Sequence, residues 1–328
     1  MYSGISGLKN FQTKLDVIGN NIANVNTYGF KKERTIFKDL ISQTQSGASS
    51  PTATRGGVNA VQVGLGSQLA AIDTIHNTGS LQTTGRVLDL AISGDGFFMV
   101  ADSAAEEMPA LEDLASLTDN PLLGEGFTNI YYTRAGNFYM DRNGFVVNGD
   151  GKYIVGIPNP EDLYGEVDEA ALSNADADKA IAAGIVGTED LYDFENGLAD
   201  LAEMGPIKIP TNAQSMSISQ DGSVYYVDVN GKLQFAGQAL LAKFPNASGL
   251  EKTGSNYFQV TANSGNPLVQ VGTQAGIGSV QSGFMEMSNV DLSEEFTEMI
   301  VAQRGFQANS RIITTSDEIL QELVNLKR

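Results

Sequence analysis

The side chains that most often carry catalysis are nearly absent from this sequence. Its 328 residues contain no cysteine and no tryptophan, and His76 is the only histidine. Without thiols, the chain has neither disulfides nor thiolate metal sites. A Ser–His–Asp triad built on His76 would need a nucleophile presented on a sharp turn, and no motif of that kind occurs. We therefore expect a structural role for His76, no catalytic residue and no enzymatic activity.

Three short motifs have some likeness to binding loops. Gly64-Leu65-Gly66 and Gly94-Asp95-Gly96 lack the spacing of nucleotide-binding loops, and neither opens a helix after a strand. Asp141-Arg142-Asn143-Gly144 lacks the alternating ligands and the closing glutamate of a calcium loop. We interpret all three as turns, and we expect neither a cofactor nor a bound metal.

Nearly all of the net charge of −19 lies in the middle third of the chain. Residues 101–205 hold 22 acidic and four basic side chains, without a defined ligand spacing. An acidic surface repels nucleic acid, so we expect no nucleic-acid partner. The stretches 101–127 and 159–205 are rich in Ala, Asp and Glu, and we interpret them as acidic insertions that project outward from a β domain.

No segment predicts membrane insertion or a cleaved leader. The sequence has no apolar run of 18 or more residues. The first residues, Met-Tyr-Ser-Gly-Ile-Ser-Gly, have no basic region followed by a compact apolar one. We therefore expect no membrane insertion and no cleaved signal peptide.

Both ends of the chain carry an apolar heptad pattern that predicts long helices. The N-terminal seam consists of Leu8, Phe11, Leu15, Ile18, Ile22 and Val25. The C-terminal seam consists of Leu292, Phe296, Met299, Phe306, Ile313, Leu320 and Val324. Asp291 and Glu294 predict the start of the second helix as a capping box. Such a helix is about 50 Å long, so we expect coiled-coil pairing with partners; a helical hairpin within one subunit is the alternative.

The middle of the chain predicts antiparallel strands. Short apolar runs are separated by turn signals such as Asn143-Gly144, Gly149-Asp150-Gly151, Asp221-Gly222 and Asn230-Gly231. We therefore predict an α+β protein. Residues 1–40 and 286–328 form a helical domain, and residues 41–100, 128–158 and 206–285 form an antiparallel sandwich or barrel-like domain. The stretch from Ser42 to Gly66 is interpreted as a connector.

Two motifs at the ends of the chain have a characteristic amino-acid sequence. The first runs from Leu15 to Lys31 and includes Asn20, Asn21, Ala23, Asn24, Thr27, Gly29 and Phe30. The second covers Glu286 to Leu292 and Ile300 to Ser310. Both resemble the rod and hook proteins of the bacterial flagellar axis. The C-terminal motif is closer to hook proteins, and the distal rod proteins are the alternative.

This resemblance implies a structural subunit that assembles with itself into a flexible helical tube and transmits motor torque to the filament. It also implies export through the flagellar type III apparatus and a place in the extracellular flagellum. The implied partners are the flagellar rod, the hook cap and the hook–filament junction proteins. A secreted β-rich protein that binds carbohydrate or cations is the alternative from another class. We also expect the ends of the isolated subunit to be frayed and to become ordered on assembly.

Overall fold

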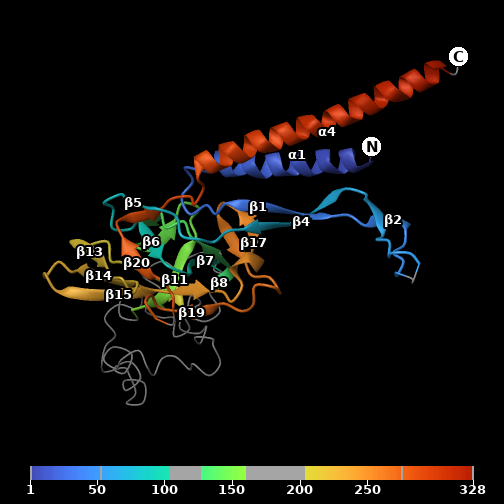
Figure 1. Ribbon diagram of the computed structural model, residues 1–328. Coiled ribbons are helices and arrows are strands. Elements are labelled where there is room, and N and C mark those ends of the chain that lie inside the picture. The colour runs from blue at the N-terminus through green and yellow to red at the C-terminus, as the bar shows by residue number, and fades with distance from the viewer. Residues whose placement is uncertain (1, 52–53, 104–126, 160–203, 275, 327–328) are drawn as a thin grey trace. The chain divides into compact units, whose positions relative to one another are not determined.

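The computed structural model describes residues 2–51, 54–103, 127–159, 204–274 and 276–326. Contacts divide the chain into two units (Figure 1). The helical unit contains residues 1–26, 31–77 and 289–328, and the β-rich unit contains residues 27–30 and 78–288. The two expected acidic insertions, 101–127 and 159–205, lie almost entirely outside the described residues.

Two antiparallel helices dominate the helical unit. Helix α1 spans Tyr2–Ala23, and helix α4 spans Leu292–Leu326. Helix α4 starts where the sequence predicts, because Asp291 Oδ1 accepts hydrogen bonds from the amides of Ser293 and Glu294 at 2.8 and 3.3 Å. This contact satisfies amides that have no partner within the helix. With 35 residues, α4 is about 50 Å long.

A two-stranded ribbon completes this unit. Strand β1 (Glu33–Asp39) pairs with β4 (Ser67–Thr74), and β2 (Ser42–Ser46) pairs with β3 (Val61–Gly64), both antiparallel. The stretch that the sequence interpreted as a connector therefore contains a hairpin. Helix α1 packs against α4 and also against β1 and β4 (Figure 1). Residues 41–77, which the sequence placed with the β domain, belong here to the helical unit.

The β-rich unit is built from short antiparallel strands. They are β5 (Leu81–Thr83), β6 (Leu90–Ser93), β7 (Phe97–Ser103), β8 (Phe127–Thr133), β9 (Phe138–Met140), β10 (Val146–Asn148), β11 (Tyr153–Pro158), β12 (Gly205–Pro206), β13 (Ser215–Ile218), β14 (Ser223–Val227), β15 (Leu233–Ala239), β16 (Leu241–Lys243), β17 (Glu251–Gly254), β18 (Tyr257–Gln259), β19 (Leu268–Gln270), β20 (Ser279–Ser282) and β21 (Phe284–Glu286), with a 3₁₀ turn η3 at Ala247–Gly249. The predicted α+β class with a mostly antiparallel β domain is confirmed.

The main sheet follows the order β13-β14-β15-β11-β7-β8-β18-β17, and β9, β10, β12, β16 and β19 pair off this path. Among the described residues it forms no closed barrel. The predicted turns lie between neighbouring strands, for example Asp221-Gly222 between β13 and β14. Gly222 has φ +88°, which favours glycine, and a Cβ there would lie 2.8 Å from the Ala239 carbonyl oxygen.

Two apolar cores explain the unbroken apolar run in β7. Successive side chains of a strand point to opposite faces. Phe98 and Val100 enter one core with Phe138 and Ile154, while Phe97 and Met99 enter a second core. Because β7 is buried on both faces, its sequence Phe-Phe-Met-Val does not alternate with polar residues.

Candidate assembly site

The contact between α1 and α4 is the candidate site, because the expected seam residues lie on these helices, except Val25, which follows the end of α1. All six residues of the N-terminal seam are buried or half-buried, and Ile18 is the most buried of them. On α4, the half-buried seam residues are Met299, Phe306 and Ile313. Two small residues of α4 are part of the same contact. Ala302 is fully buried, and Gly305 lies against the Phe11 ring. The two helices therefore meet through aromatic and aliphatic side chains set against small residues.

The fit at Gly305 is close. A Cβ on Gly305 would lie 2.6 Å from Cζ of Phe11, nearer than carbon atoms approach without displacement. A second close fit occurs at Gly7, where a Cβ would lie 3.0 Å from Nδ2 of Asn309. These contacts fix the antiparallel register of the two helices, because a shift along the axis would bring side chains against one another.

Much of α4 remains uncovered. The seam residues Leu292, Phe296, Leu320 and Val324 are exposed, and Val324 is 67% exposed. Outside the expected seam, Ile300, Val301, Ile312, Ile319, Leu323 and Leu326 are also exposed. Gly4, near the start of α1, lies against Asn309, Ile312 and Ile313. The last turns of α4, from Leu320 to Leu326, therefore extend past the described part of α1 (Figure 1).

Asn21 anchors the end of α1 to the start of β1. Its Oδ1 accepts a hydrogen bond from the Glu33 amide at 3.0 Å, and its Nδ2 donates to the Glu33 carbonyl at 2.9 Å. The same Nδ2 donates to Oε2 of Glu295 on α4 at 3.2 Å. One buried carboxamide thus joins three segments of the helical unit.

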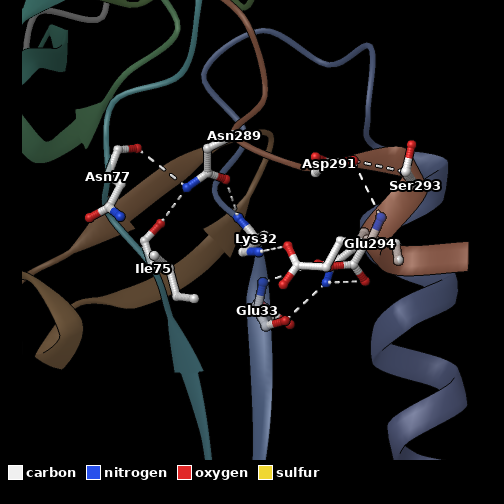
Figure 2. A network of polar contacts seen from close by, with 10 residues as sticks. Lys32, Glu33, Ile75, Asn77, Asn289, Asp291, Ser293 and Glu294 are labelled. Carbon is white, nitrogen blue, oxygen red and sulfur yellow. Dashed lines mark hydrogen bonds and ion pairs between the residues drawn. The ribbon is translucent and has the colours of Figure 1, made fainter. Parts of the chain in front are cut away.

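Asn289 has the matching role before α4, as Figure 2 shows. Its Oδ1 accepts from the Lys32 amide at 2.7 Å, and its Nδ2 donates to the carbonyls of Ile75 and Asn77 at 2.8 and 3.3 Å. Lys32 Nζ pairs with Oε2 of Glu294 at 2.8 Å. The predicted capping glutamate therefore binds Lys32. We call the set Asn21, Lys32, Glu33, Asn289 and Asp291 the helix junction.

The other residues of the N-terminal motif have separate positions. Asn24 Nδ2 donates to the Asn20 carbonyl at 2.9 Å, which closes the end of α1, while Asn20 and Ala23 are exposed. Thr27, Gly29 and Phe30 belong to the β-rich unit. The motif is therefore shared between the two units.

The roles of Asn289, Glu295 and Lys32 were not predicted from the sequence. Only the C-terminal sequence motif, which contains Asn289, pointed to one of them.

The side chains of this site are suited to contacts between protein surfaces. Among the described residues, no group of three or more histidine or acidic side chains is placed to hold a metal ion. The ion pairs Lys14–Glu298 and Lys32–Glu294 are partly exposed, and such pairs are worth only about 0–1 kcal/mol. Burial of a large apolar side chain is worth more, about 1.5–3 kcal/mol. Burial of the exposed side chains of α4 against a partner would thus contribute more free energy than these ion pairs.

One further finding concerns membranes. Within the described part of the chain, no helix has both the length and the apolar character that crossing a bilayer requires.

Three family profiles match this chain. The profile of the flagella basal body rod protein matches residues 1–31, and that of the flagellar hook protein FlgE/F/G D1 domain matches residues 123–226. The profile of the flagellar basal body rod FlgEFG protein C-terminal matches residues 281–326. The first and last of these matches include the two terminal motifs.

Similar proteins cover the whole chain. The flagellar basal-body rod protein FlgG of Bacillus subtilis is 49% identical over 330 residues, which cover 100% of this chain and 98% of that protein. The flagellar hook protein FlgE of Borreliella burgdorferi is 34% identical over 462 residues, which cover 100% of this chain and 99% of that protein. The crystal structure of the Helicobacter pylori flagellar hook protein FlgE2 aligns with 63% of this chain and with 100% of the FlgE2 chain. The TM-score is 0.37 and the sequence identity is 8%, which is too low to support an argument.

Proposed function

The chain belongs to the flagellar rod and hook protein family, and on this premise we propose that it is a hook subunit whose terminal helices join neighbouring copies into a flexible helical tube. It is a structural component of the hook and rod axis. The observation that carries the proposal is the uncovered apolar surface of α4, which continues past α1.

The neighbour that covers α4 is proposed to be a second copy of the chain, in a coiled-coil contact. Phe296, Ile300 and Leu323 are 47%, 52% and 57% exposed, which is costly for a subunit that remains single. Because α1 already covers one side of α4, we propose that the uncovered side meets a different surface on the next copy. Such a head-to-tail contact produces an open helical assembly unless its rotation closes a ring.

The hook assignment rests on the C-terminal motif from Ser288 to Ser310. The rod is the second candidate, and the 49% identity to a rod protein named FlgG favours it. Gold-labelled antibodies against this chain, applied to isolated hook–basal bodies, distinguish the two. Label along the curved segment outside the envelope is the expected result. Label confined to the straight rod would assign the chain to the rod instead.

Export and further partners follow from the same proposal. We propose that the chain passes unfolded through the flagellar type III apparatus without cleavage, assembles beneath a cap, and joins the rod at one end and the junction proteins at the other. The lack of cysteine supports this route, since no disulfide has to form or break on the way. Mass spectrometry of the assembled protein tests the point. An N-terminus shortened by a signal peptidase would contradict it.

The last part of the proposal concerns the position of the acidic insertions in the assembled tube. We propose that residues 101–127 and 159–205 face outward from the assembled tube, where like charges keep neighbouring tubes apart. A variant without residues 104–126 and 160–203, which leaves β7, β8 and β12 intact, should still assemble, and its tubes should bundle at low salt. Tubes that stay separate under these conditions would contradict the proposal.

A further inference from the structure

Arg134 and Glu286 form a buried ion pair in the β-rich unit. Their side chains are 2% and 0% exposed, and Nη1 of Arg134 lies 3.3 Å from Oε2 of Glu286. The guanidinium also donates to the carbonyls of Ile92 and Gly94 at 3.4 and 2.8 Å, and it lies 5.3 Å from the centre of the Phe97 ring. Burial lowers the pKa of Arg134, and the Glu286 carboxylate opposes that shift. Because desolvation offsets much of the attraction in such a pair, its presence favours a role in fixing geometry.

The pair holds chain segments that are far apart in the sequence. Oε1 of Glu286 accepts a hydrogen bond from the Gly79 amide at 2.9 Å, and the Glu286 carbonyl accepts one from the Gly29 amide, also at 2.9 Å. Gly29 has φ +69°, and a Cβ there would lie 2.5 Å from the Ala135 amide nitrogen. Only glycine permits this approach. We call Gly29, Gly79, Arg134 and Glu286 the clamp.

The clamp lies where the chain leaves the β-rich unit. The chain enters the β-rich unit at Thr27 and at Thr78, and it passes to the helical unit after Phe30 and after Ser288. Gly29, Gly79 and Glu286 are each within two residues of one of these crossings. Any tension that travels along the chain between the two units therefore reaches the clamp before it reaches the sheet.

Strand pairing makes this position mechanically weak without the clamp. Strands β5 and β21 are antiparallel, and Leu81 is paired with Glu286 while Thr83 is paired with Phe284. The chain thus enters β5 and leaves β21 at the same end of the pair. Tension on Thr78 and Ser288 opens such a pair from that end, one hydrogen bond at a time. The Gly79–Glu286–Arg134 contacts lie at the end that would open first.

We propose that the clamp prevents tension on the terminal helices from unzipping β5 from β21. The source of the tension rests on the proposed function, whereas the resistance belongs to the single subunit. In an assembled tube, force applied to the helices would then reach the main sheet without local unfolding. Arg134 and Glu286 act as positioning residues that keep the two crossing segments together.

Single-molecule pulling on the full chain tests the clamp. The sequence has no cysteine, so handles can be attached through cysteines introduced at the exposed positions Gln43 and Asn325. In Glu286→Gln, the buried guanidinium loses its counter-charge. The rate at which β5 separates from β21 at a given force should rise about tenfold or more, as expected for the loss of one hydrogen bond to a charged group. Glu251→Gln, at an exposed position of β17, is the matched control and should unfold like the wild type.

A second variant keeps the test decisive if Glu286→Gln does not fold. Arg134→Met combined with Glu286→Met leaves no buried charge without a partner, so the unit should still fold. Gly79 nevertheless loses its acceptor, and opening under force should again be about tenfold faster. Opening at the wild-type rate in this double variant would overturn the proposal. Because the measurement uses single subunits, it is independent of whether the chain forms a tube.

Discussion

At the scale of single residues, the two asparagines of the helix junction show why the motifs contain carboxamides. A carboxamide offers a donor and an acceptor together, whereas a carboxylate only accepts. Asn21 uses both groups on the backbone of Glu33, and Asn289 uses both on Lys32 and Ile75. Each side chain therefore acts like a short piece of strand that pairs with the chain beside it.

Replacement of Asn21 by aspartate tests this role. Asn21→Asp keeps the acceptor for the Glu33 amide, loses the donor, and adds a negative charge beside Glu295. We expect the assembled protein to lose about 2–4 kcal/mol of stability, measured by denaturation followed through helical circular dichroism. Asn24→Asp, whose amide contacts the exposed end of α1, is the control and should cost less than about 1 kcal/mol. Equal losses in the two variants would contradict the role of Asn21.

Tyr132 makes the β-rich unit sensitive to alkali. Burial raises the pKa of Tyr132 from its usual value near 10 to about 12. Because the folded state holds the phenol proton more tightly, the stability from this residue is complete below pH 10 and is lost as the pH rises toward about 12. That difference corresponds to about 2–3 kcal/mol. Tyr132→Phe should reduce the loss of stability between about pH 10 and 12 in urea titrations, and the loss that remains comes from Tyr257 and Tyr153, whose pKa values burial also raises. An unchanged pH dependence would show that Tyr132 does not control it.

At the scale of elements, α1 and α4 differ in how they are covered. Helix α1 has α4 and the β1–β4 ribbon as neighbours, so its seam is buried within the subunit. Among the described residues, the main packing partner of α4 is α1, and apolar side chains therefore remain exposed along α4. Length accounts for the exposed side chains in the last turns of α4, since α4 has 35 residues and α1 has 22.

The fit of Phe11 against Gly305 predicts opposite effects for two glycine-to-alanine changes. Alanine is favoured over glycine in a helix by about 1 kcal/mol, and Gly19 has open space around its Cβ position, so Gly19→Ala should stabilise the helical unit. Gly305→Ala should instead destabilise it by about 1–2 kcal/mol, because the new methyl group meets the Phe11 ring. Thermal denaturation checks both signs. Combination with Phe11→Leu should recover part of the loss; stabilisation by Gly305→Ala alone would contradict the fit.

The end of α4 predicts a selective effect on assembly. Replacement of Leu320 and Leu323 by aspartate removes exposed apolar side chains without disturbing the fold of one subunit. At about 1.5 kcal/mol or more for each residue, the concentration needed for assembly should rise about a hundredfold. Gln321→Asp is the matched control on the same turn. Sedimentation at increasing protein concentration measures the threshold, and an unchanged threshold in the double variant would exclude this surface from the contact.

Several of these elements could be predicted from the sequence, for physical reasons. Heptad spacing locates the apolar side of a helix, and turn residues such as Asp221-Gly222 locate the ends of strands. The β2–β3 hairpin was missed because Ser-Gln-Thr-Gln-Ser has no apolar alternation. Periodicity also cannot say which seam residues a neighbour covers, so the exposure of Phe296 was not foreseen. The contact of Asn21 with Glu295 joins residues 274 positions apart, beyond the reach of any local pattern.

At the scale of the whole molecule, the order of segments along the chain couples the two units. The helical unit is assembled from both ends of the sequence, and most of the β-rich unit lies between them. The helix pair therefore cannot form until residues 289–326 are present. A chain without α4 should fold its β-rich unit and fail to assemble, because α1 then lacks its partner and the exposed surface of α4 is absent.

The central claim is that α4 joins subunits into an open helical tube, and a cryo-electron microscopy reconstruction of the assembled full-length protein tests it most directly. We predict a hollow helical tube in which Phe296, Ile300 and Leu323 are buried against the helices of neighbouring copies. A closed ring, or a tube in which these side chains face solvent, would contradict the claim.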